Sequence, residues 1–169
     1  MTQENAEQLL HLMSMILSSN CSDNNERAEA ECQIRLLLES DESLFDLFLI
    51  LQQCQEQKYR KLAIIIINQN LNDLIKNSSL SPEQIDKIID LLISSIQNEP
   101  DFQLRIILCD LFNILIIEKQ MQIQMEKIYE FAKAMLDDGN FFTTGVYLWG
   151  LIFNSLDDEI KVESAETSA

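Results

Sequence analysis

Glycine and proline are scarce in this chain of 169 residues, which contains only 3 Gly and 2 Pro. An all-β domain of this size needs many more turn residues, so their scarcity favours a helical fold. Neither GxGxxG nor GxxxxGKS occurs, and 3 glycines are too few to build such a loop. Nucleotide binding by a glycine-rich phosphate loop is therefore excluded.

Metal ligands and catalytic groups are also few. His11 is the only histidine, and none of the 4 cysteines belongs to a CxxC or CxxH pair. Because a zinc site needs such ligands at short spacings, we expect no metal site. His11 has no obvious acidic or cysteine partner, so we expect it at a surface or edge. Without a placed nucleophile, base or metal, we expect no catalytic residue, no enzyme activity and no cofactor.

Basic residues are outnumbered, with 12 Lys and Arg against 28 Asp and Glu, a net charge of −16. Such a field repels nucleic acids and anionic membranes and attracts basic proteins, although it can also serve solubility alone. The longest apolar stretch, Leu104 to Ile117, is interrupted by Arg105 and Asp110 and is too short to cross a bilayer. The polar N-terminus resembles no targeting peptide, and the isolated cysteines indicate reduced thiols. We therefore expect no nucleic-acid partner, no membrane span, and a location in cytoplasm and nucleus.

Apolar residues make up 47% of the chain and recur with helical spacing between short polar breaks. Ser81-Pro82-Glu83-Gln84 is a helix start with a capping box, and Gly139 suits a left-handed helix end. The pattern predicts eight helices, over about residues 5–18, 24–39, 42–55, 58–76, 82–97, 101–118, 122–136 and 141–156.

The odd-numbered helices begin about 40 residues apart, which is the helix-pair period of HEAT and armadillo repeats. Short breaks make sequential helices antiparallel, and a two-helix unit buries its apolar face only by stacking. We therefore expect an all-α fold, an α-α superhelix of about four HEAT-like pairs forming a right-handed solenoid over residues 1–158. A disordered acidic tail should follow over 159–169. The alternative is a globular bundle of eight helices.

Two arginine motifs mark the region from 27 to 74. Arg27 is followed three residues later by Ala30-Glu31, and Arg60 is followed by Ala63 and an apolar run. A third arginine, Arg105, has a similar place in the sixth helix. An arginine near the start of the second helix of a pair can lay its stem on the core and bond carbonyls or carboxylates of the neighbouring repeat.

These motifs resemble the N-terminal domain of the importin-β (karyopherin-β) family. The family's Lys-Asn pair is replaced here by Asn68-Gln69, and family members are several times longer. The resemblance implies a role in nuclear transport, in which the N-terminal repeats bind the Ran GTPase in its GTP form through the second helices of the first repeats. It also implies basic cargo or nucleoporins as further partners. A different class of function remains open, a HEAT-like adaptor that holds a basic protein in a larger assembly.

The second helix of each pair lines the inner face of a solenoid, where partners bind. Polar residues off the apolar stripes of these helices are the candidate partner-binding residues, although each can instead be merely solvated. They are Gln33, Asn68, Asn72, Asp110 and Asn113.

The last predicted helix carries the densest group of aromatic residues. Phe142, Val146, Trp149 and Phe153 share one of its faces. The spacing favours a terminal core. The alternative is an exposed stacking surface, because a last repeat without a polar cap leaves its end open.

Overall fold

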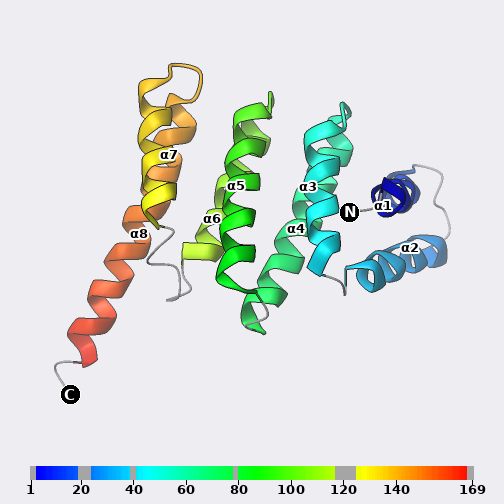
Figure 1. The fold of residues 1–169 in the computed structure, drawn as a ribbon, viewed down its shortest axis with the longest axis horizontal. Coiled ribbons are helices and arrows are strands. Elements are labelled where there is room, and N and C mark those ends of the chain that lie inside the picture. The colour runs from blue at the N-terminus through cyan, green and yellow to red at the C-terminus, as the bar shows by residue number, and fades with distance from the viewer. Residues whose placement is uncertain (1–2, 19–23, 39–40, 78–79, 117–124, 167–169) are drawn as a thin grey trace. The chain divides into compact units, whose positions relative to one another are not determined.

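A computed structural model describes residues 3–18, 24–38, 41–77, 80–116 and 125–166 (Figure 1). Within those ranges the only regular elements are helices, so the expected all-α class is confirmed. The helices are α1 (Gln3–Leu17), α2 (Asn24–Leu37), α3 (Asp41–Gln53), α4 (Gln57–Lys76), α5 (Pro82–Asn98), α6 (Phe102–Ile116), α7 (Met125–Asp137) and α8 (Phe142–Glu166).

Helix bounds agree with the sequence prediction to within a few residues, except at the end of α8. The ends predicted at Glu39 and Glu118 and the start predicted at Gln122 lie outside the described residues. α8 was expected to end at Leu156 but continues to Glu166, so residues 159–166 of the predicted disordered tail are helical. The segment contains no glycine or proline, and a helix already formed propagates readily through such a sequence.

The turn between α7 and α8 is not closed by a left-handed glycine, as the sequence suggested. Gly139 lies outside the left-handed region of backbone conformation. Instead, a carboxylate oxygen of Asp138 accepts a hydrogen bond from the Asn140 backbone N–H at 2.9 Å, and the Asp138 carbonyl accepts one from Phe141 at 2.9 Å. An aspartate turn of this kind needs no positive φ, which removes the requirement for glycine.

The chain divides into two compact units, residues 1–77 and 78–169. In the first unit α3 and α4 form an antiparallel pair, and α1 packs against α2, α3 and α4 (Figure 1). Figure 1 shows α1 nearly end on while α3 and α4 run along the page, so the first pair crosses the second pair. The core residues with the largest fully buried side chains are Leu9, Met13, Leu44, Leu47, Phe48, Ile64, Ile67 and Leu71.

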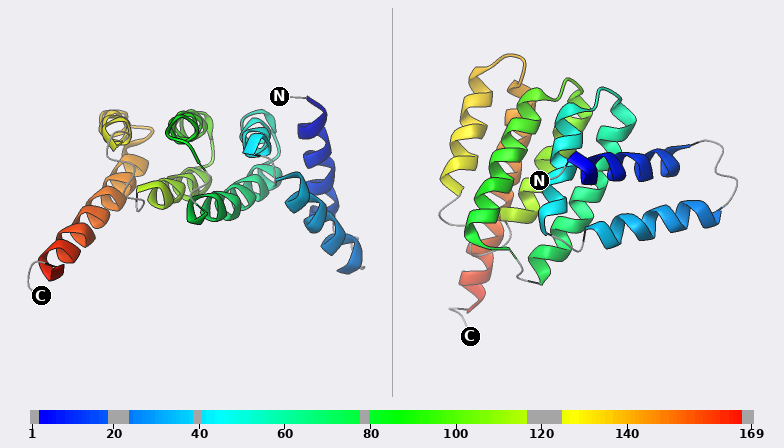
Figure 2. Two further views of the ribbon diagram at one scale, coloured as in Figure 1. Left: turned by 60° about the horizontal axis from the view of Figure 1, so that its bottom comes forward. Right: turned by 45° about the vertical axis from the view of Figure 1, so that its right-hand side comes forward.

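The second unit contains two antiparallel pairs, α5 with α6 and α7 with α8, and α6 also packs against α8. The left view of Figure 2 shows α5 and α7 in one layer and α6 and α8 in the other. Its core includes Ile88, Ile89, Leu92, Phe112, Ile128 and Leu148. The rings of Phe112 on α6 and Phe131 on α7 lie 6.4 Å apart and join the two pairs.

α5 begins as the sequence predicts. The Ser81 side chain accepts a hydrogen bond from the Gln84 backbone N–H at 3.2 Å, and the Gln84 side chain accepts one from the Ser81 N–H at 2.8 Å. Pro82 occupies the first turn, where its missing N–H leaves no helix hydrogen bond unmade. The capping box is therefore confirmed.

Candidate protein-interaction surfaces

Asn68 and Asn72, two of the predicted partner-binding residues, form a pair on α4. The side-chain amide of Asn72 donates to the Asn68 carbonyl at 2.9 Å and to the Asn68 side-chain oxygen at 3.0 Å. Both residues are half-buried. Part of their hydrogen-bonding capacity is therefore used within the helix, while the rest still faces outward.

Gln33 is exposed on α2, where its side chain donates to Glu29 over a long distance of 3.5 Å. α2 packs mainly against α1, so Gln33 is not brought into line with the Asn68–Asn72 pair by helix packing. The structure therefore does not gather the predicted residues of the first unit into a single group.

Asp110 and Asn113 lie one turn apart on α6 in the second unit, and both are half-buried. The Tyr147 hydroxyl of α8 donates to an Asp110 carboxylate oxygen at 2.5 Å. This hydrogen bond, followed by partial burial and the negative charge of Asp110, raises the pKa of Tyr147 to about 12. Asp110 thus has a structural partner, because it joins the second helices of two consecutive pairs.

The three arginines of the sequence motifs have different surroundings. Arg60 is buried, and its Nη1 donates to the carbonyls of Cys54 at 3.2 Å and Gln55 at 2.7 Å, just beyond the end of α3. These carbonyls belong to its own helix pair. The expectation of carbonyl bonding is confirmed for Arg60, but the bonded carbonyls are not those of a neighbouring pair.

Arg105 bonds a carbonyl of the neighbouring helix pair, as expected. Its Nη1 donates to the Asn140 carbonyl in the turn that precedes α8, at 3.2 Å. Its guanidinium also lies over two aromatic rings, 5.8 Å from the centre of Phe102 and 4.7 Å from that of Phe141. Arg105 therefore stabilises the contact between consecutive helix pairs through a hydrogen bond and cation–π contacts.

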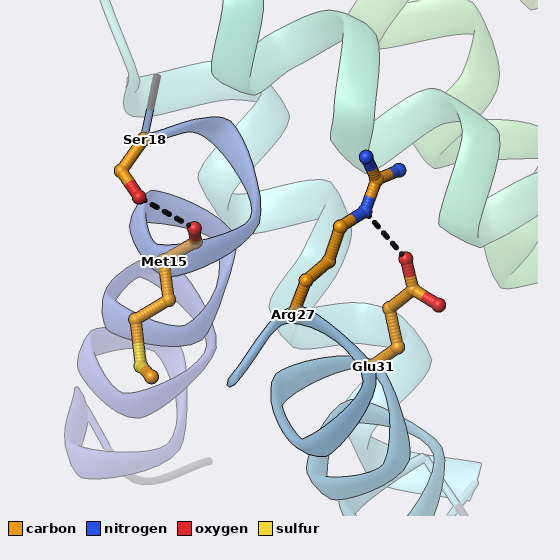
Figure 3. Close-up of polar contacts among 4 residues, drawn as sticks. All are labelled: Met15, Ser18, Arg27 and Glu31. Carbon is orange, nitrogen blue, oxygen red and sulfur yellow. Dashed lines mark hydrogen bonds and ion pairs between the residues drawn. The ribbon is translucent and has the colours of Figure 1, made fainter. Parts of the chain in front are cut away.

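Arg27 differs from both of these arginines. It is exposed on α2 and pairs with Glu31 one turn away at 3.1 Å (Figure 3). In the same view the Ser18 hydroxyl donates to the Met15 carbonyl at the end of α1, at 2.9 Å. The prediction that the stem of Arg27 lies on the core is wrong, because the buried face of α2 is formed by Ala30 and Ile34 instead.

Three of the four residues predicted to form a terminal core, Phe142, Val146 and Phe153, are exposed, so that prediction is wrong for them, whereas Trp149 is half-buried with its indole nitrogen covered. The exposed fractions are 52% for Phe142, 50% for Val146 and 59% for Phe153. The buried face of α8 is formed instead by Thr144, Gly145, Leu148 and Ile152, which pack against α6 and α7. Helical spacing identified a shared face but did not say which of two apolar faces is covered.

Tyr129 of α7 joins this surface. Its ring meets that of Trp149 edge-on at 4.6 Å, and the ring of Trp149 stacks on Phe153 at 5.3 Å. We call the five residues Tyr129, Phe142, Val146, Trp149 and Phe153 the aromatic face. The contribution of Tyr129 had no signal in the sequence, because it depends on how α7 and α8 pack.

A second exposed strip was missed on α4. Ile65 is 44% exposed, and the exposed Lys61, Gln69 and Asp73 lie in line with it at one-turn spacing, on the side away from the buried Ile67. The signal was present in the sequence as residues i, i+4, i+8 and i+12. We call Lys61, Ile65, Gln69 and Asp73 the α4 strip.

No group of three or more His, Cys, Asp or Glu side chains in the described part of the chain could hold a metal ion. Burial, with a smaller contribution from Asp110, raises the pKa of the Cys109 thiol to about 12, so this cysteine stays protonated. His11 is exposed, as expected.

No helix among the residues with described positions is long and apolar enough to cross a membrane. Comparisons of the chain with family models, curated proteins and solved structures found no match.

Proposed function

We propose that this protein is a protein-binding scaffold of HEAT-like helix pairs, a right-handed solenoid that binds a Ran-type GTPase in its GTP form during nuclear transport. The observation that carries the scaffold is the contact between residues about one repeat apart in the second unit. Lys127 lies 41 positions after Asp86 and bonds it at 3.1 Å, and Tyr147 lies 37 positions after Asp110.

Contacts of this kind are expected between stacked helix pairs, which supports the proposal. Lys127 on α7 also reaches Asp90 at 2.6 Å, so it links the first helices of two consecutive pairs. Tyr147 and Arg105 link α8 and the turn before it to α6, the second helix of the preceding pair. In a repeat protein each unit is stabilised chiefly by its neighbours, so residues about one repeat length apart in the sequence are expected to contact each other.

Support for the GTPase partner comes from the importin-β resemblance of residues 27–74. That region lies within the first unit, and the second helices that the resemblance assigns to GTPase binding correspond to α2 and α4. Both helices expose polar side chains, including Gln33 on α2 and Lys61, Gln69 and Asp73 of the α4 strip. The resemblance also supports action in cytoplasm and nucleus.

A pull-down with Ran loaded with GTP or GDP tests this partner. The proposal predicts retention of the GTP form and little retention of the GDP form. Ile65→Ser in the α4 strip should weaken retention, while Val146→Ser, an equally exposed position in the second unit, should not. Equal retention of both nucleotide forms, or of neither, would sink the GTPase proposal.

The second candidate function is an adaptor for a basic protein. The net charge of −16 favours it, because a surface of this sign attracts Lys- and Arg-rich partners. Such binding should weaken steeply as salt rises from about 50 to about 300 mM. Over this range the Debye length becomes shorter than the width of a binding site, so charges across the interface are screened from one another. It should show no dependence on nucleotide, and salt-independent binding would contradict it.

A further inference from the structure

Within the part of α8 whose side chains are described, the aromatic face exposes Phe142, Val146 and Phe153, while Trp149 between them is half-buried. Phe142, Val146, Trp149 and Phe153 follow one another at i, i+4, i+7 and i+11, so they form a continuous stripe about three turns long. Tyr129 extends the stripe onto α7. Soluble proteins rarely leave such a stripe uncovered unless it binds something.

Gly150 lies beside this stripe and gives a separate indication. A Cβ placed on Gly150 would meet nothing within 4 Å, whereas one on Gly145 in the same helix would come within 3.0 Å of Met135. Packing within the chain therefore explains Gly145 but not Gly150. A glycine in the middle of a helix weakens that helix relative to alanine. An open position beside an apolar stripe instead suits the close approach of another backbone.

The charges around the stripe indicate the sign of the charge that a partner should have. No Asp, Glu, Lys or Arg occurs between Phe141 and Leu156. The neighbouring surface of α7 carries the exposed carboxylates Glu126, Glu130 and Asp137 against the single exposed ammonium of Lys133. The rim is therefore acidic, and the whole chain has the same sign. A second copy of the chain would bring like charges together, whereas a basic partner would be attracted.

We infer that the aromatic face binds an amphipathic helix of a basic partner protein, with the helix backbone passing over Gly150. The apolar side of that helix would cover Phe142, Trp149 and Phe153, and its flanking Lys or Arg side chains would pair with Glu126 and Glu130. Helix binding to an apolar surface uses anchors at i, i+3 or i+4, and i+7, which match a stripe of this length. This site is in the second unit and does not depend on GTPase binding by the first.

A designed peptide tests the inference. The probe is a labelled helical peptide of about four turns with Leu and Trp at i, i+3, i+4 and i+7 and Lys on both flanks. Its comparators are a scrambled peptide of the same composition and a twin with Glu in place of Lys. Fluorescence anisotropy should show binding of the probe at least about tenfold tighter than that of either comparator. Equal binding of the probe and the scrambled peptide would overturn the inference.

Variants locate the site. Phe153→Ser and Gly150→Leu should each weaken probe binding about tenfold or more, because the first removes an anchor and the second blocks the approach of the backbone. Ile65→Ser, an exposed apolar position in the first unit, should leave probe binding unchanged. Phe153 and Gly150 are both exposed, so circular dichroism should report an unchanged helix content.

Two further results would contradict the inference. Probe binding that survives Phe153→Ser and Gly150→Leu would place the peptide elsewhere. A dimer in sedimentation that Phe153→Ser dissociates would show instead that a second copy covers the face. Ran binding measured on the same variants should be unaffected, so failure of the GTPase proposal and failure of this one are separate results.

Discussion

Arg60 joins the end of α3 to the start of α4 through its two carbonyl contacts, at 3.2 and 2.7 Å. Replacing it with methionine keeps the apolar stem at this buried position but removes the charged donor of both part-buried hydrogen bonds. Arg60→Met should therefore lower the free energy of unfolding by about 2 kcal/mol, as measured by urea denaturation.

The matched control is Arg27→Met, which removes the same group from an exposed pair on α2. Exposed ion pairs one helical turn apart contribute little to stability, so the free energy of unfolding should change by no more than about 0.5 kcal/mol. If the two substitutions lower the free energy of unfolding by the same amount, the structural role assigned to Arg60 would be wrong.

Tyr147 should make stability depend on pH in the alkaline range. Its pKa is raised from the ordinary 10.0 to about 12 in the folded chain, with the Asp110 hydrogen bond as the largest cause. The unfolded chain therefore loses this proton at lower pH than the folded chain. The stabilising contribution should be complete below pH 10 and be lost as pH rises to 12.

The measurement is urea denaturation from pH 9 to about 12, compared between the parent chain and Tyr147→Phe. The variant should lose this part of the pH dependence, while Tyr129→Phe should keep it because the Tyr147–Asp110 bond is intact. An identical pH profile for the parent and Tyr147→Phe would contradict the assignment.

At the residue scale the sequence predicted the chemistry of Arg60 and Arg105 but not the exposure of Arg27. All three arginines have similar spacing to apolar residues, and spacing does not say whether a helix face is covered. Asp110 was likewise identified as an outward polar residue. Its bond to Tyr147, 37 positions away, depends on the packing of α6 against α8 and could not be read from either helix alone.

At the scale of helices, α8 contains two glycines, Gly145 and Gly150, whose surroundings differ. A Cβ on Gly145 would lie 3.0 Å from the Met135 Cβ and 3.1 Å from the Leu136 backbone nitrogen, so α7 and α8 would have to separate. Gly145→Ala should destabilise the chain by at least about 1 kcal/mol, in line with overpacked core positions.

Gly150→Ala should stabilise the chain, in contrast to Gly145→Ala. Its Cβ would enter open space, and alanine favours the helix by about 0.5 to 1 kcal/mol over glycine. Thermal unfolding followed by circular dichroism should give a higher midpoint for Gly150→Ala and a lower one for Gly145→Ala. Changes of the same sign in both variants would contradict the packing described for α7 and α8.

The positions of the helices were predicted better from the sequence than any other feature, because apolar periodicity and polar breaks are strong local signals. The Ser81 capping box was predictable for the same reason. The exposed aromatic face was not, because α8 has apolar residues on two faces and only the contacts with α6 and α7 decide which one is buried. The sequence underestimates the length of α8 because the acidic residues after Leu156 resemble a solvated tail, whereas the helix continues to Glu166.

At the scale of the whole chain, the repeat period predicted in sequence agrees with the contacts of Lys127 and Tyr147 in the second unit. The crossing of α1 and α2 over the α3–α4 pair was not expected from a regular stack. Among its described side chains α2 buries only Ala30 and Ile34, and it packs against α1.

The division into two units was also absent from the sequence prediction, which treated residues 1–158 as one domain. The break that separates the units is as short and polar as the other breaks, so nothing local distinguishes it. Division of a helical chain depends on the total of side-chain contacts across each break, and these are set by tertiary packing.

Calorimetric titration of the whole chain with Ran tests the proposed function most directly, using Ran that carries GDP or a non-hydrolysable GTP analogue. A scaffold that acts in nuclear transport through α2 and α4 should bind the GTP form at least about tenfold tighter than the GDP form, a difference of roughly 1.4 kcal/mol. Ile65→Ser should reduce that preference. Equal affinity for the two forms, or no heat of binding with either, would contradict the proposal.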